Sequence, residues 1–141
     1  MKAKFIIKHS NKKNDLDYIY DNYICFQDYI YDKKINETLI FYCIREDNRN
    51  LFDYILEKGC DINHKNIHGT TPIKTAIIQK KLYYVKKILE HNPDLTIKDN
   101  MDFTPDYYTS LNKYPKYDFR DDTSKEIEII IKEYMNYVNN I

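Results

Sequence analysis

Apolar residues recur along the chain in short stripes that alternate with polar turns. From Leu51 to Leu56, and again from Tyr84 to Leu89, four apolar side chains occupy positions i, i+1, i+4 and i+5. This spacing is typical of the buried face of an amphipathic helix. The sequence therefore predicts a helix over each of these segments, with its polar face turned to solvent.

The two stripes belong to a longer pattern that repeats every 33 residues. Thr38, Thr71 and Thr104 recur at this spacing in similar local sequence, and the same offset carries Asp61 onto Asp94. A period of this length indicates an array of units that bury their apolar faces against one another. We therefore expect stacked helix pairs, with the two central pairs beginning their first helices at Thr38 and Thr71.

The best-preserved unit has suitable residues at the start of its first helix. Gly69 permits a turn with positive φ, Thr71 can cap the helix through its hydroxyl, and Pro72 suits the first helical turn. Ile73 and Ala76 follow three residues apart. They are expected to face the core.

The ends of the second helices carry a second set of turn residues. Gly59 follows one of these helices, where a left-handed residue is needed, and Asn92 takes the equivalent place one repeat later. Asp61 and Asp94 come next, and their carboxylates can bind backbone N–H groups of the turn. These residues predict the beginning of a hairpin after each helix pair.

The run Asn66-Ile67-His68-Gly69-Thr70-Thr71-Pro72-Ile73-Lys74-Thr75-Ala76, with the apolar helix and the aspartate that follow it, closely resembles an ankyrin repeat. The resemblance implies an all-α ankyrin repeat solenoid of about four stacked helix-turn-helix repeats, with short β-hairpin loops and degenerate capping ends. On this register the chain is a single domain. It divides into an N-terminal cap (1–33), two repeats (34–65 and 66–98) and a C-terminal repeat (99–141) with an insertion at 112–122.

Several residues depart from the family pattern. Lys80 replaces the usual glycine between the helices, and Lys74 replaces the histidine that ties neighbouring repeats together. Each departure is expected to lower stability by about 1 kcal/mol. Asp106 stands where a buried leucine is usual. After the insertion, Thr123 or Ser124 is expected to cap a closing helix, whose apolar face comprises Ile127, Ile130, Ile131, Tyr134 and Val138.

Composition narrows the class of protein without pointing to a reaction. The 141 residues include 22 Lys plus Arg and 22 Asp plus Glu, so no long-range field draws the chain to nucleic acid or to an anionic membrane. Without a secretory signal or an apolar run of membrane-spanning length, the sequence favours a soluble, cytoplasmic protein. Cys25, Cys43 and Cys60 are far apart and are expected to be reduced, buried thiols.

Two segments could instead form a metal site or a nucleic-acid-binding site. Cys60, His64 and His68 are spaced along one hairpin as a candidate metal site, but no fourth ligand is evident, and we expect no metal or other cofactor. The Lys/Tyr-rich segment 80–87 has the composition of a nucleic-acid-binding surface. Since its apolar residues fit the core stripe, a solvated outer face explains its lysines better, and no nucleic-acid partner is expected.

Ankyrin repeats are, by resemblance, binding scaffolds. We therefore expect no enzyme activity, and a protein partner that contacts the hairpin tips and the concave face of the first helices. On the family register the contact residues are Arg45, Glu46, Ile67, Thr70, Ile78, Gln79, Met101 and Phe103. The same surface includes Lys34, Glu37 and Leu111. The chain is expected to be a monomer. Its amino-acid usage, rich in Ile, Asn and Tyr and typical of AT-rich genomes, is similar to that of ankyrin proteins of large DNA viruses, and apicomplexans, slime moulds and intracellular bacteria share this usage. A viral or parasite protein of this kind would have a host protein as its partner.

Overall fold

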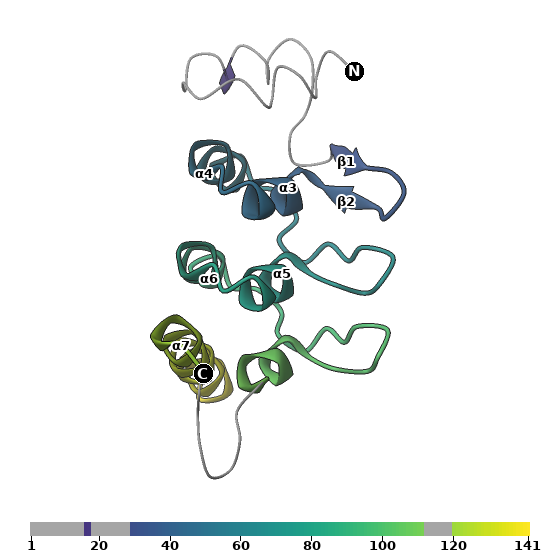
Figure 1. Ribbon diagram of the computed structural model, residues 1–141. Coiled ribbons are helices and arrows are strands. Elements are labelled where there is room, and N and C mark those ends of the chain that lie inside the picture. The colour runs from purple at the N-terminus through teal and green to yellow at the C-terminus, as the bar shows by residue number, and fades with distance from the viewer. Residues whose placement is uncertain (1–15, 18–28, 112–119) are drawn as a thin grey trace.

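The computed structural model describes residues 16–17, 29–111 and 120–141. Helix pairs stack on one another, and a loop projects from the same side of each pair (Figure 1). The pairs are α3 (Leu39–Arg45) with α4 (Arg49–Glu57), α5 (Pro72–Ile78) with α6 (Leu82–Leu89), and the 3-10 helix η2 (Pro105–Ser110) with α7 (Asp122–Asn139). In the first loop, β1 (Ile30–Asp32) and β2 (Glu37–Thr38) form an antiparallel hairpin. The predicted helical stack is confirmed.

One continuous apolar core runs through the stack. Helix α3 packs on its partner α4 and on α5 of the next pair, and α5 in turn packs on α6 and η2. The predicted second-helix stripes lie in this core, where the rings of Phe52 and Tyr84 meet edge to face with centroids 4.6 Å apart. Ile73 and Ala76 are buried, as predicted. Each repeat thus covers the apolar face of its neighbour.

The backbone repeats with the same 33-residue period as the sequence. Residues with positive φ occur at three equivalent places in the described repeats: Asn36, Gly69 and Asp102 at the hairpin turn, Asp47 and Lys80 between the helices, and Gly59 and Asn92 after the second helices. Asparagine, aspartate or lysine therefore stands at several places where glycine would adopt a positive φ without strain.

The first helices begin at the predicted residues, but the predicted capping bond is wrong. Thr38 and Thr71 are the N-cap residues of α3 and α5, and Pro72 occupies the first turn of α5. The hydroxyls of both threonines are buried and have no hydrogen-bond partner among the described residues. Both residues have an extended backbone, which β-branched side chains favour. This preference accounts for threonine without a capping bond.

The closing helix α7 begins earlier than the sequence analysis predicted. Its N-cap is Asp121, not Thr123 or Ser124, and the Asp121 carboxylate accepts the backbone N–H of Ser124 at 2.7 Å. The predicted insertion, 112–122, is therefore too long at its C-terminal end, because Asp121 is the N-cap of α7 and Asp122 is its first residue. Residues 112–119 of the insertion lie outside the described residues.

Only part of the predicted apolar face of α7 is buried. Ile127 and Ile131 are buried against η2 and α6, whereas Val138 is exposed. The helix has 18 residues, against 8 in α6, so its C-terminal half has no equivalent in the preceding repeat. The apolar pattern of α7 therefore continues beyond the residues that α6 can cover.

The proposed N-terminal cap, residues 1–33, lies mostly outside the described residues. Within it, the side chain of Leu16 is buried in the core, and the carboxylate of Asp17 accepts a hydrogen bond from the hydroxyl of Tyr54 at 2.6 Å. These two residues contact the first described repeat.

Replacing Lys80 with glycine is expected to stabilise the protein by about 0.5 to 1 kcal/mol. Lys80 has a φ of 55°, which glycine adopts without strain. Its ammonium pairs with Asp121 at 3.1 Å, but both side chains are more than half exposed, so losing this pair subtracts little. Urea unfolding measures the change. Lys80→Ala loses the ion pair and keeps the strain, so it is the matched control; a glycine variant no more stable than the alanine variant would contradict the account.

Candidate partner-binding surface

Hydrogen bonds between neighbouring hairpins hold the hairpin turns in one row. The backbone N–H of Ile67 donates to the carbonyl of Ile35, and the N–H of Asn100 donates to the carbonyl of His68, each at 3.0 Å. The side-chain amide of Asn100 also donates to the carbonyl of Ile67 at 2.9 Å. The three turns are therefore fixed relative to one another.

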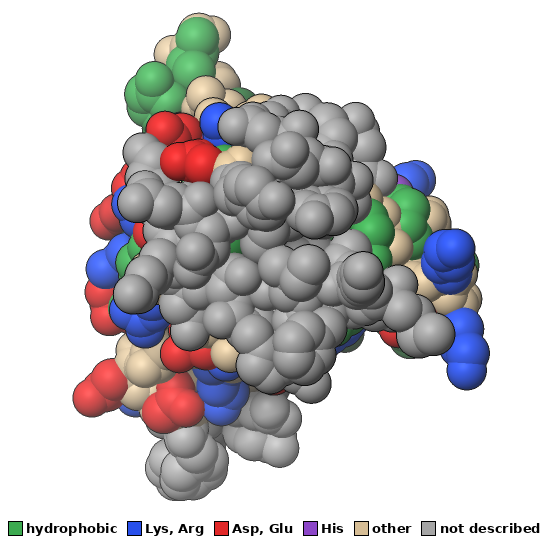
Figure 2. All heavy atoms as spheres, turned by 90° about the horizontal axis from the view of Figure 1, so that it is seen from above, with side chains coloured by type: hydrophobic (Ala, Val, Ile, Leu, Met, Phe, Trp, Pro, Cys, Tyr) green, Lys and Arg blue, Asp and Glu red, His purple; other side chains and the backbone are tan. Residues whose placement is uncertain are grey.

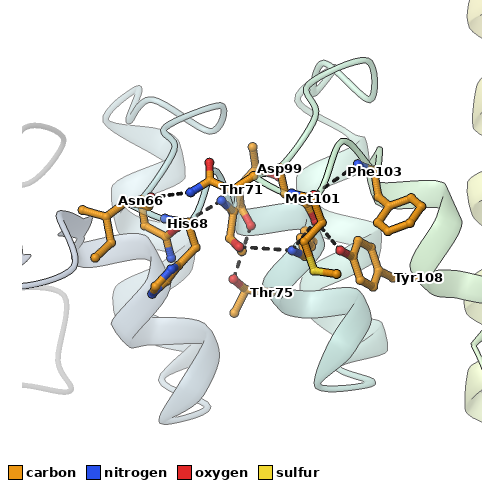
Figure 3. A network of polar contacts seen from close by, with 12 residues as sticks. Asn66, His68, Thr71, Thr75, Asp99, Met101, Phe103 and Tyr108 are labelled. Atoms are coloured by element: carbon orange, nitrogen blue, oxygen red, sulfur yellow. Dashed lines mark hydrogen bonds and ion pairs between the residues drawn. The ribbon is translucent and has the colours of Figure 1, made fainter.

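A side-chain oxygen at equivalent positions stabilises each of the last two turns from inside. Oδ1 of Asn66 accepts the N–H groups of His68 and Thr70 at 2.9 and 3.0 Å. In the next repeat, Oδ1 of Asp99 accepts the N–H groups of Met101 and Phe103 at 2.9 and 3.1 Å (Figure 3). The turns that carry Ile67 and Met101 thus have the same internal support.

Lys74 joins the second repeat to the third, which corrects the expectation that this residue loses an inter-repeat hydrogen bond. Its Nζ donates to Oδ2 of Asp99 at 2.6 Å and to Oγ1 of Thr70 at 3.3 Å. The ammonium also lies 4.3 Å from the centroid of the Tyr108 ring, and the Tyr108 hydroxyl donates to Asp99. Lysine therefore provides the tie that the family's histidine would provide.

The carboxylate of Asp99 remains charged although it is buried. Its side chain is only 2% exposed, and that of Lys74 is 12% exposed. Burial raises the pKa of Asp99, but hydrogen bonds from Lys74, Tyr108 and two backbone N–H groups outweigh this effect and hold the pKa well below its usual range. The pair is a buried ion pair at neutral pH, so removing one partner would leave the other charge uncompensated.

A related contact joins the first repeat to the second. Both terminal guanidinium nitrogens of Arg45 donate to the carboxylate of Glu37, and Nδ2 of Asn66 donates to the same carboxylate at 2.9 Å. Glu37 is 1% exposed, so its placement on the open binding surface is wrong. Arg45 remains partly exposed, but its charge is engaged within its own repeat.

These polar contacts between repeats were not predicted, although the 33-residue repeat contains a signal for them. Asp99 falls on Asn66 in the 33-residue register, and both side chains offer an oxygen that accepts hydrogen bonds. Aligning the hairpins residue by residue would have predicted their shared role. The partners Lys74 and Tyr108 come from separate elements, and only the fold brings them together.

Three of the candidate contact residues are exposed apolar side chains. Met101 is 72% exposed and Ile67 is 52% exposed, on neighbouring hairpin turns, and Ile78 at the end of α5 is 49% exposed. Of the polar candidates, Glu46 and Gln79 are exposed and Thr70 is half-buried. The hairpin row and the exposed end of the first helix therefore both present apolar groups.

Phe103, the fourth apolar candidate, is only partly accessible to a partner. It is half-buried and stacks face to face on Tyr107, with ring centroids 3.9 Å apart and an interplanar angle of 7°. A groove of about 550 Å³ lies beside this pair, between η2 and α7, and Lys98, Asp106 and Lys132 line it. Phe103 therefore offers one face of a stacked aromatic pair.

The Lys/Tyr-rich segment 80–87 forms ion pairs with nearby carboxylates. Lys80 pairs with Asp121 at 3.1 Å and Lys86 with Glu126 at 3.3 Å, so two of its lysines face acidic side chains of the α7 region. The hydroxyl of Tyr83 donates to Asp53 at 2.6 Å. These pairs reduce the positive potential that a phosphate backbone would require.

The three candidate metal residues have different surroundings, and the side chain of His68 is exposed. Nε2 of His64 lies 2.8 Å from the carbonyl of Asn36, and Cys60 is half-buried. Burial, assisted by the charge of Asp61, raises the pKa of the Cys60 thiol to about 11, which keeps it protonated. Within residues 16–17, 29–111 and 120–141, no cluster of three His, Cys, Asp or Glu side chains has a metal-binding arrangement.

Helix pairs that repeat every 33 residues, with hairpins aligned along one side, define a helical repeat protein. A family model described as ankyrin repeats (three copies) matches residues 4–99. The chain therefore belongs to the ankyrin repeat family. The described pair η2 and α7 continues the stack beyond the matched residues.

Ankyrin repeat proteins of two poxviruses are among the similar proteins. One, from Myxoma virus (strain Lausanne), is 33% identical over 51% of this chain and 13% of its own length. Another, from Fowlpox virus (strain NVSL), is 32% identical over 55% of this chain and 24% of its own length. A third, from the bacterium Rickettsia felis, is 31% identical over 48% of this chain and 34% of its own length.

The chain thus spans about a third or less of the length of these relatives. Among the described helices, none is both long enough and apolar enough to cross a membrane.

Proposed function

We propose that the chain binds a protein partner through the hairpin row and the exposed ends of its first helices. Ankyrin repeats generally serve as protein–protein interaction modules, which supports a partner of this class. The observation that carries the proposal is the pair of exposed apolar side chains, Ile67 and Met101, on adjacent turns that backbone hydrogen bonds hold in place.

Rigid support of these side chains favours binding. A partner that buries Ile67 and Met101 gains free energy from the apolar surface removed from water. Because the turns are already fixed by Asn66 and Asp99, little conformational entropy is lost when the partner docks. A few anchors of this kind can supply most of the affinity of an interface.

The remaining candidate residues have different roles in this proposal. Ile78 extends the apolar contact onto α5, and the stacked ring of Phe103 extends it toward the last repeat. Glu46 and Gln79 are exposed polar groups at the rim. Arg45 contributes less than an unpaired cation would, because Glu37 already engages its guanidinium.

The poxvirus relatives support a viral source and a host protein as the partner. The interaction would then take place in the cytoplasm of the host cell, between the partner and a monomer of this chain. No metal, cofactor or catalytic group takes part in the proposal.

Capture experiments test this surface directly. Changing Ile67 and Met101 together to serine is expected to reduce capture of host proteins by about 10-fold or more, because apolar anchors are lost from the interface. Thermal unfolding should change little, since both side chains are exposed. The matched control changes Ile129 and Tyr137, exposed apolar residues of α7, to serine. Loss of capture in the control and not in the hairpin variant would contradict the proposal.

A further inference from the structure

We infer that the partner segment seated on the hairpin row is acidic and carries apolar anchor residues. This inference rests on the proposed function and concerns the same surface. The hairpin row is defined as residues 32–36, 65–69 and 98–102, which occupy equivalent positions in the three hairpins.

Exposed charges on the hairpin row are mostly positive. Lys33, Lys34, Lys65 and Lys98 are exposed there, whereas Asp102 is the exposed acid of the row and pairs with Lys98 at 3.2 Å. The other acids are Asp32 and Asp99. Asp32 is half-buried and accepts the backbone N–H of Lys34 at 3.0 Å, and Asp99 is buried and neutralised by Lys74. The first two turns therefore carry lysines that form no ion pair with a described residue.

Two lysines of α6, on the helical side of the stack, pair with carboxylates. Lys86 pairs with Glu126 and Lys87 with Glu90, and the formal net charge of the whole chain is zero. Viewed down the stack, blue and green side chains gather on the hairpin side, at the right of Figure 2, whereas red and blue mix on the opposite side. Lysines outside an ion pair with a described residue therefore lie beside the exposed apolar residues of the hairpins.

Each of the three turns also carries an apolar side chain, one to three residues after a lysine. Ile35 is half-buried and Ile67 and Met101 are exposed, on three successive turns that are joined by backbone bonds. An acidic peptide can place carboxylates on the lysines and apolar side chains between them, so both kinds of group are satisfied. Nucleic acid fits less well, because the turns offer isoleucine and methionine where stacked bases require aromatic rings.

A displayed library of random peptides tests this chemistry with the full chain. Peptides selected by the unchanged chain are expected to be acidic and to contain at least one large apolar residue. Their affinity should fall about 10-fold or more in a Lys33→Glu, Lys34→Glu, Lys65→Glu variant, and also as salt rises from about 0.05 to 0.5 M. A Lys81→Glu, Lys86→Glu, Lys125→Glu variant changes the net charge equally on the helical side and should retain binding.

Circular dichroism melts establish that both charge variants are folded before binding is compared. Neutral or basic peptides that still lose affinity in the Ile67→Ser, Met101→Ser variant would overturn the acidic partner and leave the proposed function intact. Equal loss of affinity in both charge variants would also overturn it. A single-stranded RNA probe that binds the row more tightly than the acidic peptides would assign the lysines to nucleic acid. A library with no binding peptide would overturn the acidic peptide segment, and the capture experiment above would then decide the proposed function by itself.

Discussion

Replacing Lys74 with methionine is expected to lower the free energy of unfolding by about 2 to 4 kcal/mol. Methionine keeps most of the apolar stem and removes the ammonium that donates to Asp99 at 2.6 Å. The carboxylate of Asp99 would then remain buried with only Tyr108 and two backbone N–H groups as donors. Chemical unfolding of the variant beside the unchanged chain measures the loss.

A second substitution at Asp99 provides the control. Asn66 shows that an asparagine at the equivalent position accepts the same two backbone hydrogen bonds of the turn. Asp99→Asn should therefore keep the turn while removing the buried charge, and the double variant Lys74→Met, Asp99→Asn should regain part of the stability lost in Lys74→Met. If the double variant loses as much stability as the two single variants together, the side chains of Lys74 and Asp99 are not energetically coupled.

Replacing Gly69 with alanine is expected to lower the free energy of unfolding by about 3 kcal/mol. Gly69 has a φ of +73°, and a Cβ atom there would lie 2.8 Å from Cα of Asp99 and 3.0 Å from the backbone N of Asn100. These are backbone atoms of the next hairpin, so the two turns would have to separate. Thermal and urea unfolding measure the effect on stability.

Gly59 separates the two causes of this loss. It has a φ of +84°, but nothing lies within 4 Å of an added Cβ. Gly59→Ala therefore measures the conformational strain alone, which is about 1 kcal/mol. If both alanine variants lose the same stability, the close approach of the hairpins at Gly69 has no energetic consequence.

Local sequence was sufficient to predict the repeat architecture. The caps at Thr38 and Thr71, the core residues Ile73 and Ala76, and the left-handed Gly59 all depend on residue types whose conformational preferences act within a few neighbours. Because each repeat buries its face on an almost identical neighbour, a correct prediction for one repeat carried over to the next.

The details that the sequence did not predict depend on contacts between repeats. A lysine in place of a histidine suggested a lost bond, but Lys74 is long enough to reach Asp99 in the following repeat. The exposure of Glu37 was misjudged because Arg45 and Asn66 bury it from two repeats. Asp121, rather than Thr123 or Ser124, caps α7, and because all three types are suitable N-cap residues, residue type alone could not distinguish them.

Hydrogen–deuterium exchange of the chain with and without a captured partner tests the hairpin row most directly. The account predicts slower exchange of backbone amides in residues 65–69 and 98–102 when the partner is bound, with little change in α4 and in the C-terminal half of α7. Protection confined to α4, α6 or α7, with the hairpin turns unchanged, would contradict it.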